Sequence, residues 1–128
     1  MPTIDDATPR TPTPGDTDHA AILAAVRATV RDVLHKPVTL DTDTLRMLGE
    51  HAFMQATMRE PDGRPLDYAD TPLADDAAQG RRSDICMALL RRERDGWVPM
   101  VSQVGPTDLA WAAWQDQYDV PAALFPTL

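Results

Sequence analysis

The chain has few of the residues that form cross-links or bind metals. Cys86 is the single cysteine among 128 residues, so an internal disulfide and a cysteine-ligated metal cluster are both excluded. A lone thiol is typical of a reducing compartment. No apolar run approaches the roughly 18 residues of a membrane span, and the amino terminus lacks the basic start and apolar stretch of a signal peptide. We therefore expect a cytoplasmic protein without membrane contact, or a periplasmic one whose signal peptide has been removed.

Lysine is almost absent, and the charge balance is acidic. The chain has 12 Lys and Arg against 20 Asp and Glu, a formal net charge of −8, and Lys36 is its only lysine. An acidic surface repels phosphate, so nucleic acid and anionic membrane are not expected partners. The same charge steers a basic protein partner, or serves only to keep the protein in solution.

The common catalytic motifs are also missing. The sequence has no Gly-rich phosphate loop, no Gly-x-Ser-x-Gly elbow and no His-Glu-x-x-His. The histidines His19, His35 and His51 fall at a helix start, a helix end and a turn, which does not predict a zinc site. Cys86 has apolar neighbours in a strand pattern, which predicts a buried thiol rather than a nucleophile. We therefore predict a non-enzymatic protein with no metal and no cofactor.

Prolines mark the limits of the first segments. Residues 1–16 hold four prolines and four threonines with little to bury, which predicts a flexible tail. Ile22, Val26 and Val30 then recur at helical spacing, and Pro37 ends the pattern, so we expect a helix over about residues 18–35. Residues 17–128 are expected to form a single domain.

Alternating apolar residues predict an antiparallel sheet. Strands are expected over residues 38–47, 51–59, 83–90 and 97–104, with a short additional one at 64–68. The apolar phase changes between Leu40 and Leu45, which indicates a bulge or an edge strand. Pro99 indicates a bulge or a free edge in the last strand, where simple alternation puts Trp97 and Val101 on one face. Residues 69–82 lack periodicity and are expected to form a mobile loop.

The three tryptophans lie within residues 97–114. Trp111, Trp114 and Tyr118 are spaced as one face of a helix that Thr107 caps and Pro121 ends. Burying the indoles would supply much of the core in a chain with 5% aromatic residues, although tryptophan also favours interfaces. The expected fold is α+β: an N-terminal helix on a curved antiparallel sheet of four to five strands, then a C-terminal helix. This order is similar to cystatin-like and nuclear-transport-factor-like folds.

Part of the sequence resembles a known group of proteins. The run ALLRRERDGWVPMVSQVGPTDLAWAAW, with HAF and PDGRPLDY before it, is similar to a group of small uncharacterised bacterial proteins. The resemblance covers about residues 45–125 and implies no activity. Pro99 departs from the group's pattern, in which an ordinary strand residue is expected.

The acidic middle loop is the leading candidate for a binding surface. We expect a basic partner to bind at Asp67, Tyr68, Asp70, Asp75 and Asp76, as an immunity protein or inhibitor would bind it, with the chain a monomer or homodimer. Arg81 and Arg82 offer an alternative, because they can pair with these acids internally.

Two other functions remain open from the sequence. One is a small-ligand-binding protein or isomerase-like enzyme, with a pocket in the curved sheet lined by Tyr68, Trp97 or Trp111. The other is an acidic secretion chaperone, which should be a dimer with an exposed apolar groove.

Overall fold

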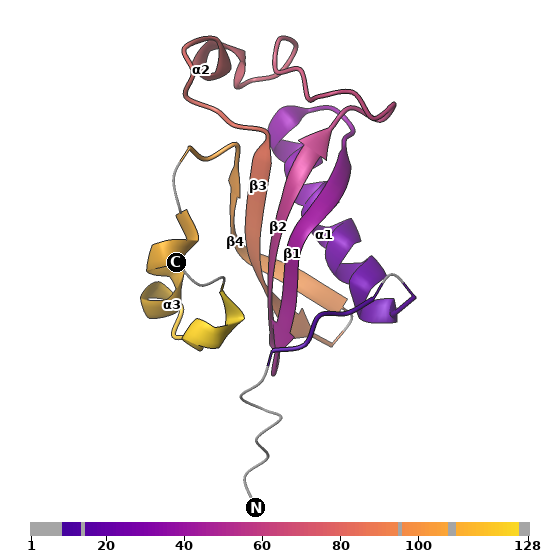
Figure 1. The fold of residues 1–128 in the computed structure, drawn as a ribbon, viewed down its shortest axis with the longest axis vertical. Coiled ribbons are helices and arrows are strands. Elements are labelled where there is room, and N and C mark those ends of the chain that lie inside the picture. The colour runs from indigo at the N-terminus through magenta and orange to yellow at the C-terminus, as the bar shows by residue number, and fades with distance from the viewer. Residues whose placement is uncertain (1–8, 14, 95, 108–109, 126–128) are drawn as a thin grey trace, which may run out of the picture.

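The described residues form one long helix, a four-stranded sheet and a set of short helical segments (Figure 1). The computed structural model describes residues 9–13, 15–94, 96–107 and 110–125. In chain order the elements are α1 (Thr17–Leu34), β1 (Thr39–Leu48), β2 (His51–Arg59), α2 (Ala74–Ala78), β3 (Ile85–Glu93), β4 (Gly96–Val104) and α3 (Trp114–Gln117). The strands pair antiparallel in the order β1-β2-β3-β4, so the expected α+β class is confirmed, with four strands.

Helix α1 covers one face of the sheet. Its buried stripe is Ile22, Val26, Val30 and Leu34, the pattern of a helix that buries one face. The helix ends at His35, whose backbone has a positive φ of 59° and whose amide donates to the Arg31 carbonyl at 2.7 Å. His35 is thus a left-handed C-cap. The helix expected over about residues 18–35 is confirmed.

The C-terminal residues cover the opposite face, so the sheet lies between two layers (Figure 1). Phe53 on β2 faces this second layer, while its neighbours Ala52 and Met54 face α1. Trp111 and Trp114 pack on Phe53 in the second layer, whereas Trp97 lies in the core beneath α1. All three indoles are therefore buried in the core, divided between the two faces.

Both edge strands contain a bulge. In β1 the register shifts between Thr42 and Thr44, which brings Leu45 back to the face that Leu40 occupies before the bulge. In β4 the shift falls opposite Leu89 and Leu90. Each bulge adds one residue and reverses the alternation beyond it. The bulge expected in the first strand is confirmed.

Pro99 lies beside the β4 bulge, on an edge strand, as the sequence indicates. The prediction that Trp97 and Val101 share a face is wrong, because this bulge lies between them. Trp97 packs toward α1 and Val101 toward the C-terminal layer.

Three further expectations differ from the structure. Residues 64–68 form no strand, and Pro65 makes only an isolated bridge with Arg59. Residues 69–82 contain the helix α2 and hydrogen-bonded turns. The single C-terminal helix is instead a 3-10 turn, Ala110–Ala113, followed by α3 and a second 3-10 turn, Ala122–Leu124. Because a 3-10 turn repeats every three residues, it directs Trp111 and Trp114 to the same face.

Two sequence expectations concern segments that the structure describes only in part. The first turn expected after the Thr107 cap falls on residues 108 and 109, outside the described residues. In the N-terminal segment, Arg10 and Met47 exchange backbone hydrogen bonds of 2.7 and 2.6 Å at the edge of β1. The flexibility expected for residues 1–16 stays a prediction.

Asp18 joins the start of α1 to the β3–β4 hairpin. Its carboxylate accepts hydrogen bonds from Arg92 at 3.1 and 3.2 Å and from the Trp97 indole N–H at 3.1 Å. The Arg92 guanidinium lies 4.5 Å from the centre of the Trp97 ring. The hydrogen bonds from Arg92 and then Trp97 lower the pKa of Asp18 below its usual 3.8, despite partial burial.

We expect Asp18→Asn to lower the free energy of unfolding by about 1–3 kcal/mol at neutral pH, because it removes charge-assisted hydrogen bonds. A lowered folded-state pKa stabilises the fold above the unfolded pKa, and that contribution is lost as pH falls through the folded value. The difference between wild type and variant should therefore shrink below pH 3.8. Urea unfolding at neutral and acidic pH measures it. Asp32→Asn, on the exposed side of α1, is the control, and equal losses in the two variants would contradict this role of Asp18.

Candidate functional site

The connection between β2 and β3 carries the predicted binding residues. It spans residues 60–84, includes α2 and lies beyond one end of the sheet (Figure 1). Glu60 and Arg64 begin it with a tight turn, in which the Glu60 amide donates to the Arg64 carbonyl at 2.9 Å. The Pro61-Asp62-Gly63 turn expected from the sequence lies between them.

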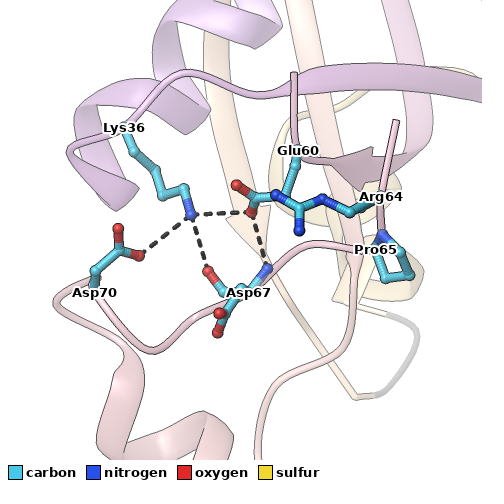
Figure 2. A pocket seen from close by; sticks show the side chains of 6 residues that line it. All are labelled: Lys36, Glu60, Arg64, Pro65, Asp67 and Asp70. Atoms are coloured by element: carbon cyan, nitrogen blue, oxygen red, sulfur yellow. Dashed lines mark hydrogen bonds and ion pairs between the residues drawn. The ribbon is translucent and has the colours of Figure 1, made fainter. Parts of the chain in front are cut away.

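Lys36 fixes this connection to the end of α1. Its ammonium donates to Glu60 Oε2 at 2.9 Å, to the Asp67 carbonyl at 3.1 Å and to Asp70 Oδ1 at 3.2 Å (Figure 2). The same Glu60 oxygen accepts the Asp67 amide at 2.9 Å. All three ammonium hydrogens therefore have acceptors, and residues far apart in sequence converge on one side chain.

Lys36 is held as a cation. Burial by itself would lower the pKa of the Lys36 ammonium, but the hydrogen bonds and charges of Glu60 and Asp70 outweigh it, and the pKa is raised. A lysine nucleophile needs a lowered pKa. The three hydrogen bonds of the ammonium and its raised pKa together favour a structural role for Lys36 over covalent catalysis.

Tyr68 fixes the other side of the connection. Its hydroxyl donates to the Ser83 carbonyl at 2.6 Å, and Ser83 in turn donates its amide to the Gly105 carbonyl at 3.0 Å. Burial raises the pKa of Tyr68 to about 12, so the phenol stays protonated at neutral pH. Tyr68, one of the residues predicted to contact a partner, is half-buried and hydrogen-bonded within the chain.

Two of the predicted acidic residues pair internally. Asp70 pairs with Lys36, and its side chain remains 74% exposed. Asp76 accepts a hydrogen bond from Arg82 at 3.1 Å and lies 4.0 Å from Arg81. The internal pairing considered from the sequence therefore applies to Asp76.

The other two acidic residues keep their charge available. Asp67 and Asp75 are exposed and form no ion pair within the described part of the chain. One Asp67 oxygen accepts the Ala69 amide at 2.9 Å, which restricts the orientation of the carboxylate. The carboxylates of Asp67, Asp70 and Asp75 thus lie exposed on one connection.

Two hollows adjoin this connection. The first, of about 330 Å³, is polar, and its lining is Lys36, Glu60, Arg64, Pro65, Asp67 and Asp70 (Figure 2). The second, of about 280 Å³, lies between residues 66–69 and α2. The structure does not bring Tyr68, Trp97 and Trp111 together, because Trp97 and Trp111 lie on opposite faces of the sheet.

The described residues lack both a metal-ligand cluster and a membrane-spanning helix. They contain no group of three or more His, Cys, Asp or Glu side chains placed to hold a metal ion. No helix in the same part of the chain is long and apolar enough to cross a membrane.

Sequence reasoning missed Lys36 and Glu60 as site residues. The signal available was that Lys36 is the chain's only lysine and follows a helix end. Its contact with Glu60 spans 24 residues, and no local periodicity reports a polar contact of that range.

Cys86 is buried in β3, as the sequence predicts. Burial raises the pKa of its thiol to about 12. We expect the native protein to react with Ellman's reagent at least about a thousandfold more slowly than the protein unfolded in urea, since reaction needs an opening of the fold. Absorbance at the dye wavelength measures the rates. A native rate near the unfolded one would contradict the burial.

Comparisons of the chain with protein-family models, with curated proteins and with solved structures find no match.

Proposed function

We propose that the chain is a non-enzymatic interaction protein, and that its acidic connection binds a basic protein partner, as an immunity protein or inhibitor does. The observation that carries this proposal is the exposure of Asp67, Asp70 and Asp75 on a segment whose backbone is fixed by Lys36 and by Tyr68. A fixed segment loses little conformational freedom on binding. The net charge of −8 favours the approach of a basic partner.

Two observations support this function over a small-ligand-binding protein or isomerase-like enzyme and over an acidic secretion chaperone. The groups with raised pKa values, Lys36, Tyr68 and Cys86, are all poorly suited to acid–base or nucleophilic work near neutral pH. The exposed large hydrophobic residues of the described chain are Val33 and Val98, fewer than the apolar groove of a chaperone would need.

The test is capture of partners from the native cell extract on the immobilised chain, at low and high salt. Asp67→Asn/Asp75→Asn removes two exposed charges from the connection, and Asp32→Asn/Asp116→Asn removes the same charge elsewhere. We expect the wild type and the control to retain the same protein at low salt and release it at high salt, and the loop variant to lose it. Three outcomes contradict the proposal: equal capture by the two double variants, capture that is the same at low and high salt, or no capture at all.

A further inference from the structure

The backbone of residues 66–69 separates the two hollows, and Asp67 lines both. We infer that the two hollows form one docking surface, which receives an arginine side chain of the partner in the polar hollow and a neighbouring apolar side chain in the other. This inference rests on the proposed function and names the partner's recognition element.

The polar hollow has an excess of negative charge. Three carboxylates line it, those of Glu60, Asp67 and Asp70, against two cationic side chains, Lys36 and Arg64. Lys36 is shared between Glu60 and Asp70. A cation is therefore what complements this hollow.

Arginine fits the polar hollow better than lysine does. Its planar guanidinium has five N–H donors and binds carboxylates through paired hydrogen bonds. Asp67 and Asp70 are exposed residues of the hollow's lining. Arg64 also lines the hollow, and it pairs with Asp62 at 2.7 Å. A guanidinium in this hollow would have the carboxylates of two lining residues, Asp67 and Asp70, as acceptors.

The second hollow is suited to an apolar side chain. Apart from Asp67, its lining is uncharged and mostly apolar, with Leu66 and Tyr68 on one side and Ala74, Ala77 and Ala78 on the other. The alanines come from α2, whose small side chains leave the space open. An aliphatic side chain placed there would bury part of its surface against methyl groups and gain hydrophobic free energy.

The surface between the hollows is held in place from within. Leu66, Tyr68 and Leu73 pack against the core beneath α1, while Lys36 binds the Asp67 carbonyl from the other side. Both hollows are therefore formed before a partner arrives, which lowers the cost of binding.

The test is an NMR titration of the ¹⁵N-labelled full chain with blocked tetrapeptides. The three peptides are acetyl-Gly-Arg-Leu-Gly-amide and its analogues with Gln for Arg or Ser for Leu. We expect the Arg-Leu peptide to shift the amides of Asp67 and Ala77 and to bind roughly five to ten times more tightly than either analogue, a difference of about 1 kcal/mol. Binding of all three alike, binding elsewhere on the chain, or no binding overturns the inference.

Variants of the chain test which hollow binds the arginine of the peptide and which binds its leucine. Asp67→Asn should weaken the Arg-Leu peptide severalfold and leave the Gln-Leu peptide unchanged. Ala78→Leu should fill the second hollow and reduce the Arg-Leu peptide to the affinity of the Arg-Ser peptide. Asp32→Asn is the matched charge control, and an equal effect from it overturns the inference.

The two proposals fail in distinguishable ways. If Asp67→Asn/Asp75→Asn abolishes partner capture but the peptides do not bind in the hollows, the binding function stands and this recognition element is wrong. If the peptides bind as expected but Asp67→Asn/Asp75→Asn captures as much partner as the wild type, the binding role of the two hollows is supported and the proposed function is wrong.

Discussion

Phe53→Ala should lower the free energy of unfolding by about 3–5 kcal/mol, the range for truncating a fully buried aromatic side chain. Phe53 is 0% exposed on β2, one of the two inner strands of the sheet. Its ring meets Trp111, Trp114 and Phe125 edge-on, with centroids 6.2, 6.4 and 5.2 Å away. The change therefore removes hydrophobic contact, leaves a cavity and breaks three aromatic pairs.

The effect should be concentrated in the C-terminal layer. That layer consists of helical segments of three or four residues, which are too short to be stable alone. Its attachment depends on the packing around Phe53 and on Arg46, which donates to the Phe125 carbonyl at 2.7 Å. We therefore expect Phe53→Ala to weaken the near-ultraviolet circular dichroism of the tryptophans and to shift their fluorescence to the red.

Phe53→Leu is the matched control for this prediction. Leucine keeps much of the volume and all of the apolar character, so the loss should be clearly smaller. Urea unfolding followed by fluorescence measures both variants. A loss below about 1 kcal/mol for Phe53→Ala would mean that the C-terminal layer is not packed on the sheet as described.

Helix α1 and the four strands of the sheet were predictable because their signals are local. In β3, Cys86 and Ala88 face α1 while Met87 and Leu89 face the C-terminal layer. A strand covered on both sides is apolar at every position, which is how the sequence reads there. The first bulge was predictable for the same reason, because a change of apolar phase within one strand has few other causes.

The candidate site was only partly predictable. The acidic character of residues 67–76 is visible in the sequence, and so is the option that Arg82 pairs with Asp76. The contacts of Lys36 with Glu60, Asp67 and Asp70 are not visible there, because they join groups 24 to 34 residues apart in the chain. Polar contacts of that range depend on the completed sheet, and residue type and spacing do not report them.

Gly105→Ala should lower the free energy of unfolding by roughly 2–4 kcal/mol, combining an unfavourable backbone conformation with a steric clash. Gly105 has a φ of +70°, which favours glycine, and a Cβ there would lie 2.5 Å from the Tyr68 hydroxyl and 3.0 Å from the Ser83 carbonyl. The methyl group must displace Tyr68 or the backbone, and so breaks the hydrogen bond of 2.6 Å from Tyr68 to Ser83.

Gly63→Ala separates the two contributions. Gly63 also has a positive φ, +91°, but nothing lies within 4 Å of a Cβ built there, so this variant should lose only the conformational part, about 1 kcal/mol. Removing the hydroxyl removes the closest clash, so Tyr68→Phe/Gly105→Ala should lose less stability than the sum of its single variants. Urea unfolding of the four variants measures this coupling. Additive losses, or equal losses for Gly105→Ala and Gly63→Ala, would show that Tyr68 does not pack against Gly105. The expected coupling would identify this contact as one that attaches the acidic connection to the end of β4.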